Sequence, residues 1–228
     1  MKIKFSGVGI TDGRGKFGGS VASRNTAGAY IRNKVTPVNP DTPAQSAVRA
    51  TFADISQAWR DLTQTQRDQW NEAVPSFEHT DIFGDTIQPT GFNLHQQLNL
   101  NLGAIGLPFI TSPPAPAEVQ SLTNLTLQLN MAGNALEVTS TEAIEASTDF
   151  IIEATVGLSA GISFVDSELK SIVIVTDSDA FPIDIQLAYD AVFGAFPPVT
   201  SKVFVRMVGV NNTTGQRGSG IKASLIIS

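Results

Sequence analysis

The clearest periodic pattern in the chain lies between residues 42 and 62. Apolar side chains there follow one another at intervals of four, three, four and three residues, and they are Val48, Phe52, Ile55, Trp59 and Leu62. This spacing predicts one amphipathic helix of about 19 residues with a single apolar face. A capping box at residues 42–45, with proline at the first helical position, predicts where the helix begins.

A second, shorter helix is predicted directly after the first. Thr63 and Gln66 form another capping box, and Pro75 marks the end of the helix. Because almost no connector separates the two helices, the chain must turn sharply, and we expect Trp59 and Trp70 to close the corner. The predicted structural core of these helices consists of Phe52, Trp59, Leu62 and Trp70.

The pattern continues with two short strands and a third helix. The strands are predicted around the turn residues Gly84 and Asp85. The third helix is predicted to start at Gly91 and to end at Gly103 or Gly106. Its apolar side consists of Phe92, either Leu94 or His95, Leu98 and Leu102. Residues 39–106 therefore form a small helical module.

The first 38 residues are rich in glycine and show only short apolar alternation. We predict a strand, a turn after Asp12 and Gly13, and a second extended segment through Tyr30. A segment with so little apolar surface does not fold alone. We therefore expect it to become ordered against the rest of the chain or a neighbouring subunit.

The composition changes again after residue 106. Four prolines in residues 107–117 predict an extended linker. From residue 118 to residue 228, short alternating runs separated by turn signals predict an all-β sandwich of the immunoglobulin or fibronectin type. The runs are 119–129, 135–139, 150–156, 161–165, 171–176, 183–189, 202–210 and 221–227, and the last two form a hairpin. The expected fold class is α+β with two domains.

Charge is distributed unevenly along the chain. The net charge is −6, but the first 50 residues sum to +6 and the rest to −12. This contrast favours association of the basic segment with the acidic body of another copy or with an acidic partner, the alternative being that both regions are simply solvated. The candidate assembly residues are Lys2, Lys4, Arg14, Lys16, Arg24, Arg32 and Lys34.

Few residues are arranged for catalysis or cofactor binding. Residues 13–18 match the letters of the dinucleotide fingerprint, but no helical pattern follows to direct its N-terminus at a phosphate. The chain has no cysteine, and His79 and His95 have no third ligand in range, which argues against zinc. Asp177, Asp179 and Asp184 lack the EF-hand pattern, so an acidic loop is favoured over calcium. We expect no enzyme, no cofactor and no metal.

Two further partner classes are disfavoured. The second helix has one arginine and two acidic residues, too few donors for a DNA recognition helix, although the basic N-terminal segment leaves contact with packaged nucleic acid as a weaker alternative. No apolar run has the length of a transmembrane helix or signal peptide, so we expect no membrane contact and assembly in the host cytoplasm.

Residues 18–70 resemble a group of small phage and prophage structural proteins. In that group a glycine-rich basic segment precedes an Asn-Pro-x-Thr-x-x-Gln pattern and a Trp-x-x-Leu-Thr-x-x-Gln-Arg-x-x-Trp pattern, followed by a variable β domain. The matching residues are Asn39, Pro40, Thr42, Gln45, Arg49, Phe52, Trp59, Leu62, Thr63, Gln66, Arg67 and Trp70, followed by Gly91, Phe92 and Asn93.

The resemblance implies a repeated component of the virion, in the head, neck or tail, that forms homo-oligomers and contacts other virion proteins. The alternative is a non-catalytic module whose β sandwich recognises a glycan or a host surface. Such a site needs exposed aromatic side chains, yet both tryptophans lie in the helical module and Tyr189 is the only tyrosine of the β domain.

Overall fold

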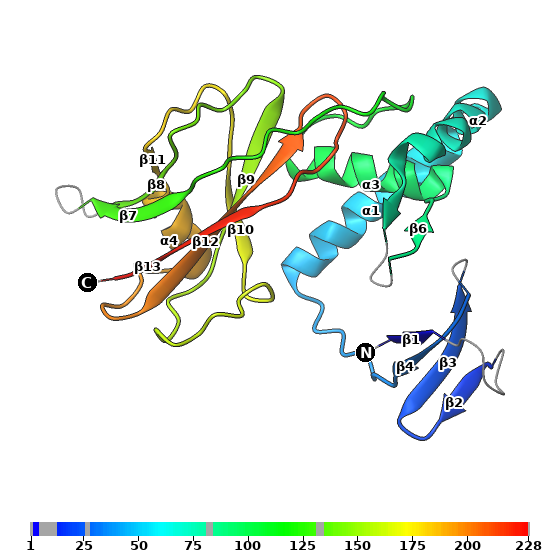
Figure 1. Cartoon of the computed structure of the whole chain (residues 1–228), viewed down its shortest axis with the longest axis horizontal. Helices are drawn as coiled ribbons and strands as arrows, with labels where there is room; N and C mark the ends of the chain where they lie inside the picture. The colour runs from blue at the N-terminus through cyan, green and yellow to red at the C-terminus, as the bar shows by residue number, and fades with distance from the viewer. Residues whose placement is uncertain (1, 5–12, 26–27, 81–83, 131–134, 228) are drawn as a thin grey trace. The chain divides into compact units, whose positions relative to one another are not determined.

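The computed structural model describes residues 2–4, 13–25, 28–80, 84–130 and 135–227 (Figure 1). The chain divides into two compact units. The N-terminal unit is Met1–Arg49 with Glu78–Ile87, and the main unit is Ala50–Phe77 with Gln88–Ser228. The chain contains both helices and antiparallel sheets, which is compatible with the α+β class.

The N-terminal unit contains a four-stranded antiparallel sheet, the N-terminal sheet, where the sequence predicted only two extended segments. Its strands are β1 (Lys2–Lys4), β2 (Gly15–Phe17), β3 (Ser20–Asn25) and β4 (Gly28–Asn33), in the order β1-β4-β3-β2. Gly18 has a φ of 57°, which suits the tight turn between β2 and β3. The same unit contains the predicted short strands, β5 (His79–Thr80) and β6 (Thr86–Ile87). Residues 81–83, between these two strands, lie outside the described residues.

The predicted helices are confirmed. They are α1 (Pro43–Asp61), α2 (Gln64–Ala73) and α3 (Gly91–Ala104), and a 3₁₀ turn, η1 (Val74–Phe77), follows α2. The Gln45 N–H donates to Thr42 Oγ1, and Thr63 and Gln66 make both bonds of the second capping box. Gly106 adopts a φ of 76° just after α3, as expected for a helix that ends at a glycine.

The helical core differs from the predicted one at Phe52. Leu62, Trp70, Val74, Leu94 and Leu98 form a buried cluster, with Trp59 half-buried against it. Phe52 was expected in this core, but 47% of its surface is exposed. The reason is rotation about the helix axis, because at this turn Thr51, one residue earlier, lies beside Gly103 of α3.

Residues 118–228, here the C-terminal β region, form two antiparallel sheets. The strands and one helix are β7 (Thr126–Asn130), β8 (Ala135–Thr139), β9 (Thr148–Ala154), β10 (Lys170–Val175), β11 (Ile183–Asp184), α4 (Gln186–Phe193), β12 (Lys202–Asn211) and β13 (Ile221–Ile226). One sheet has the order β10-β9-β12-β13 and the other β11-β8-β7. A single core, which includes Leu136, Ile152 and Val205, draws its residues from both sheets. The predicted hairpin of the last two strands is confirmed by the pairing of β12 with β13.

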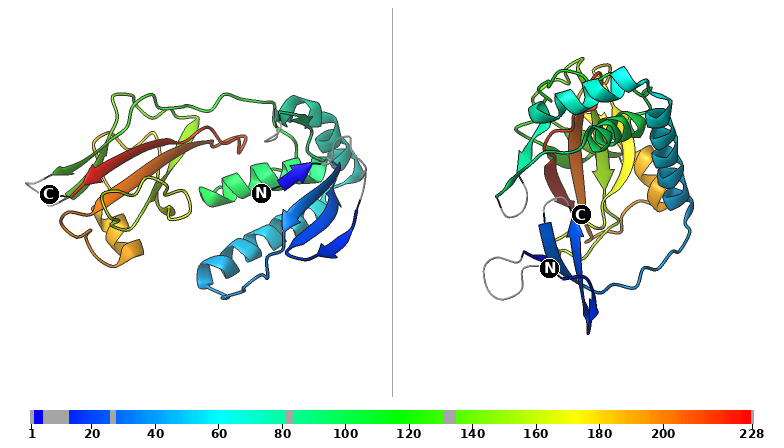
Figure 2. Two further views of the ribbon diagram at one scale, coloured as in Figure 1. Left: turned by 60° about the horizontal axis from the view of Figure 1, so that its bottom comes forward. Right: turned by 90° about the vertical axis from the view of Figure 1, so that its right-hand side faces the viewer.

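Three of the predicted strands are wrong or too long. Residues 161–165 form no strand, and residues 119–125 precede β7 without pairing in a sheet. Residues 183–189 form the two-residue β11 and then the first turn of α4, which lies beside β10 (Figure 2). Helix is favoured here because Tyr189 becomes fully buried and its hydroxyl donates to the Thr155 carbonyl at 3.0 Å.

Helix α3 packs directly against the C-terminal β region. Leu102 and Ile105 share a buried cluster with Ile151 and Val210. The loop between β12 and β13 reaches α3, where Asn101 Nδ2 donates to the Gly215 carbonyl at 2.8 Å (Figure 1). The α3 helix and the C-terminal β region therefore share buried apolar contacts.

Residues 107–117 contain no helix or strand, as the prolines predicted, but they are bound along the helices. The Ile110 N–H donates to Asn99 Oδ1 at 2.7 Å, and Trp70 Nε1 donates to the Thr111 carbonyl at 3.0 Å. The beginning of the predicted linker is thus held in place by buried side chains.

Candidate interaction surfaces

The register of the N-terminal sheet places two cations on one face. Lys16 of β2 lies opposite Val21 of β3, and Val21 lies opposite Arg32 of β4. Directly opposed residues of antiparallel strands point to the same side of a sheet, so these three side chains share a face with Ser23 and Tyr30. Lys16 and Arg32 are exposed, and two strand spacings separate them by about 10 Å. We call this surface the basic face.

The other candidate cations do not all belong to the basic face. Arg24 pairs with Ala29 and therefore lies on the opposite side of the sheet, with Ala22 and Ile31. Arg14 precedes β2 and Lys34 follows β4, both exposed. Lys2 and Lys4 lie on β1, whose backbone pairs with Arg32 and Tyr30, and their side chains are outside the description.

A second surface follows the chain from the N-terminal sheet into α1. Every residue from 34 to 54 is exposed except Gln45 and Thr51, which are half-buried. The exposed fractions reach 85% for Val38 and 64% for Val48. Within this run, Arg49 is held by Asn39 Oδ1 at 2.5 Å and Asp41 Oδ1 at 3.4 Å. An open cavity of about 380 Å³ is lined by Ala44, Gln45, Val48 and Arg49.

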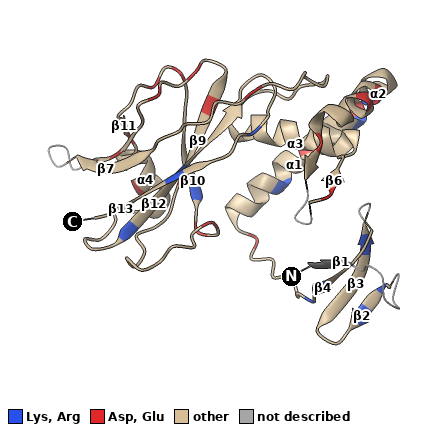
Figure 3. Ribbon diagram, in the orientation of Figure 1, with Lys and Arg blue, Asp and Glu red and all other residues tan. Residues whose placement is uncertain are grey.

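A third surface lies on the loops of the C-terminal β region and is acidic. Two hollows of about 320 and 610 Å³ share Glu142 and Ala143. The acidic residues that line them, here the acidic end, are Glu118, Glu142, Glu145, Asp177 and Asp179, and no lysine or arginine lines either hollow. Figure 3 shows acidic residues along these loops and basic residues on the N-terminal sheet.

The residues weighed for calcium do not converge at the acidic end. Asp177 and Asp179 line one hollow, but Asp184 lies on β11 and accepts the Gln186 N–H at 2.8 Å. Asp179 accepts the Thr176 N–H at 2.8 Å, which closes the local turn. Among the described residues no group of three histidine or acidic side chains is placed to hold a metal ion.

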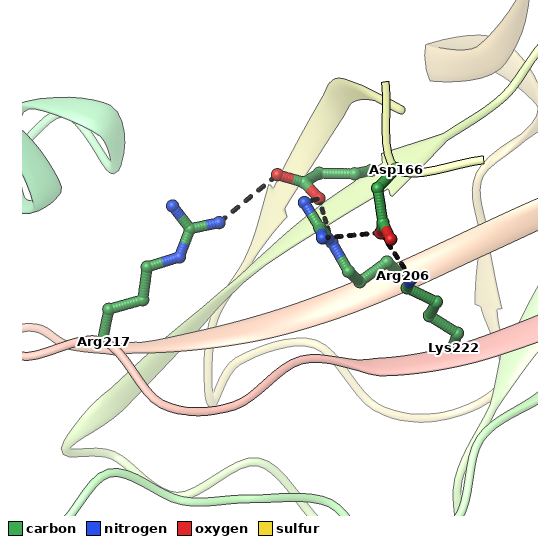
Figure 4. Close-up of polar contacts among 5 residues, drawn as sticks. Asp166, Arg206, Arg217 and Lys222 are labelled. Atoms are coloured by element: carbon green, nitrogen blue, oxygen red, sulfur yellow. Dashed lines mark hydrogen bonds and ion pairs between the residues drawn. The ribbon is translucent and has the colours of Figure 1, made fainter. Parts of the chain in front are cut away.

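Three cations of the C-terminal β region, Arg206, Arg217 and Lys222, are paired with carboxylates in one network (Figure 4). Glu153, 14% exposed at its side chain, binds Arg206 at 2.5 Å and Arg217 at 3.4 Å. Asp166 pairs with Arg206 at 3.4 Å and with Lys222, and the hydrogen bond from Lys222 is the main cause of the lowered pKa of Asp166. The sequence did not reveal this network, because β9, β12 and β13 must first be set in register for Arg206 to lie opposite Glu153 and Lys222.

His95 is buried between the two tryptophans. Its ring centroid lies 5.3 Å from that of Trp59 and 5.1 Å from that of Trp70, both in edge-on geometry. His95 is 1% exposed, and its Nδ1 has no hydrogen-bond partner among the described residues. Burial lowers the pKa of His95 from 6.5 to about 4. Leu94 and His95, given as alternatives for the apolar side of the third helix, are therefore both buried, and His95 occupies the corner assigned to the two tryptophans.

Comparison with known proteins adds no relative. No protein-family model, curated protein or solved structure matches the chain. In the part of the chain that is described, none of the helices has the length and apolar character needed to cross a membrane. The candidate surfaces must therefore be interpreted from their own chemistry.

Proposed function

We propose that this protein is a non-catalytic structural component of a bacteriophage virion, in the head, neck or tail. It assembles with copies of itself and with other virion proteins through the N-terminal segment and α1. The observation that carries this proposal is the exposed run of residues 34–54, which leads from the N-terminal sheet into a regular helix.

The apolar side chains of this run favour a protein partner over bulk water. Val35, Val38, Val48 and Phe52 are all exposed, the last two on successive turns of α1. Burying a side chain of this size contributes about 1.5–3 kcal/mol, so an assembly that covers several of them gains substantial free energy. The apolar pattern that is buried at Ile55 thus continues outward along α1 as a surface for association.

Two further considerations support a virion role. Residues 18–70 resemble phage and prophage structural proteins over the same segment that carries the exposed run. The C-terminal β region, with strands arranged four and three in two sheets, suits an immunoglobulin-like unit that is displayed on the particle or packed between subunits. A fold alone does not indicate a function. The proposal therefore depends on the exposed run of residues 34–54 and on the resemblance of residues 18–70 to phage structural proteins.

The test measures the solution mass of the full chain by light scattering over a range of concentrations. We expect a defined multimer, and we expect Val48→Glu with Phe52→Glu to reduce it to smaller species, because buried carboxylates would have no partner. Leu187→Glu is the matched control, since Leu187 lies on α4 and is 86% exposed. A chain that stays monomeric at all concentrations, or a multimer that the double variant leaves intact, would contradict assembly through α1.

A further inference from the structure

We propose that the basic face of the N-terminal sheet binds the acidic end of the C-terminal β region on a second copy of the chain. The inference rests on the proposed function, because it names the two surfaces through which copies associate. The proposed partner of the basic face is a second copy of the chain, and charge complementarity within the chain identifies this partner.

The cations of the basic face are not neutralised. Lys16 and Arg32 are exposed, and neither forms an ion pair or side-chain hydrogen bond with a described residue. Val21 lies between them in the cross-strand row and is only half-buried. The face therefore offers two separated positive charges on either side of an apolar side chain, which suits a protein surface with spaced carboxylates.

The cations of the C-terminal β region, in contrast, are all engaged. Arg206, Arg217 and Lys222 belong to the network with Glu153 and Asp166. The ammonium groups of the other two, Lys170 and Lys202, lie over the rings of Phe193 and Phe204 at 5.3 and 4.7 Å. This region thus has no free cation to offer its own carboxylates.

The acidic end retains uncompensated carboxylates. Glu118, Glu145 and Asp177 have no side-chain hydrogen bond or ion pair with any described residue. They line hollows that contain no lysine or arginine, so no cation at the acidic end offsets their charge. Free positive charge is therefore presented by the N-terminal sheet and free negative charge by the acidic end.

A contact between these two surfaces limits the symmetry of the assembly. The basic face of one copy binds a different surface on the next, so the contact does not join one patch to itself. Two copies that make the contact reciprocally form a twofold dimer, whereas a contact made in one direction repeats until it closes into a ring or extends as a filament.

The experiment uses two charge-reversal variants of the full chain. One is Lys16→Glu with Arg32→Glu on the basic face, and the other is Glu145→Lys with Asp177→Lys at the acidic end. We expect each variant alone to associate at least tenfold more weakly than the natural chain in sedimentation velocity at low salt. An equimolar mixture should restore association, because the reversed acidic end of one variant then meets the reversed basic face of the other.

Two controls define the outcome. Lys170→Glu with Lys202→Glu makes the same change in net charge as the basic-face variant and should leave association unchanged. Circular dichroism checks that each variant is folded, and restoration in the mixture independently shows that both variants remain competent to bind. Association of the natural chain should also weaken at high salt, because exposed charges are screened over about 10 Å at 0.1 M ionic strength.

The inference and the proposed function fail in different ways. If a multimer forms and the α1 variant breaks it while both charge reversals leave it intact, the inference is overturned and the proposed function stands. If both reversals weaken association but their mixture does not restore it, the basic face and the acidic end do not bind each other. A natural chain that is monomeric at low salt overturns both, including the case in which the basic face binds the acidic end of its own copy.

Discussion

Two four-stranded antiparallel sheets in this chain differ in what they bury. In the β10-β9-β12-β13 sheet, neighbouring residues such as Ile151 and Ile152 are both buried, because one face joins the main core and the other packs against α3. In the N-terminal sheet, Ala22 is the only buried apolar residue among those described. The strands pair in antiparallel fashion in both sheets, so the two sheets differ in how much apolar surface they cover and not in how their strands pair.

Truncation of one isoleucine in each sheet should give the largest difference. Ile152→Ala removes a fully buried side chain from the main core and should lower the free energy of unfolding by about 4 kcal/mol. Ile31→Ala, in the centre of the N-terminal sheet, should cost less than about 1 kcal/mol, because its side chain is only half-buried. Urea unfolding followed by circular dichroism measures both changes.

Conservative variants at the same positions should show the same difference in stability on a smaller scale. Ile152→Val should cost about 1 kcal/mol and Ile31→Val almost nothing. Hydrogen exchange should show weaker protection for β3 and β4 than for β9 and β12. Equal losses from Ile152→Ala and Ile31→Ala would mean that Ile31 is covered as fully as Ile152, and the two sheets would then not differ in burial.

A substitution at Gly215 should disturb the contact between α3 and the β12–β13 loop. This contact lies where α3 packs against the β10-β9-β12-β13 sheet. Gly215 has a φ of 72°, and an added Cβ would collide with the backbone of Leu98 in α3. Gly215→Ala should therefore destabilise the main unit by about 3 kcal/mol, from backbone strain together with overpacking. Thermal unfolding by calorimetry measures the loss.

Gly194 provides the control for Gly215. It also has a positive φ, 83°, but nothing lies within 4 Å of an added Cβ. Gly194→Ala should cost only the backbone term, about 1 kcal/mol. If both substitutions cost the same, the close approach of the β12–β13 loop to α3 contributes nothing to stability.

Local patterns in the sequence were enough to predict the helices. Capping residues and apolar spacing placed α1, α2 and α3, because those signals act within a few residues. The exposure of Phe52 could not be predicted in this way, since apolar spacing alone does not show that α1 turns Thr51 rather than Phe52 toward α3. Residues 183–189 were assigned to a strand because short apolar runs fit both periods, and burial of Tyr189 favours helix there.

The candidate surfaces were only partly predictable. The charge count identified the basic N-terminal segment and the acidic body. It could not show that Lys16 and Arg32 share a face while Arg24 lies on the other, because this follows from strand register. Nor could it show that Arg206 is paired with Glu153, since these residues are far apart in sequence and meet only when β9 and β12 pair.

A smaller effect than those of Ile152→Ala and Gly215→Ala concerns His95 and the pH dependence of the main unit. The unfolded chain binds a proton at His95 near pH 6.5, whereas the folded chain does so only near pH 4. The stability is therefore full above about pH 6.5 and falls as the pH is lowered to about 4. At pH 5 the loss from this group should be about 2 kcal/mol, measured by urea unfolding with tryptophan fluorescence.

Replacing the imidazole by a ring that does not titrate isolates this contribution. His95→Phe keeps an aromatic side chain between Trp59 and Trp70, and it sacrifices no bond at Nδ1, which has no partner among the described residues. The variant should lose less stability than the natural chain between pH 6.5 and 5, while His79→Phe, at an exposed position of β5, should follow the natural chain. Carboxylates such as Asp166, whose pKa is also lowered, are common to all three proteins, so their acid-induced losses cancel in the comparison. Parallel curves of unfolding free energy against pH for His95→Phe and the natural chain would mean that water reaches His95 in the folded protein. The helical module would then be exposed to water like the N-terminal unit, and not closed like the main core.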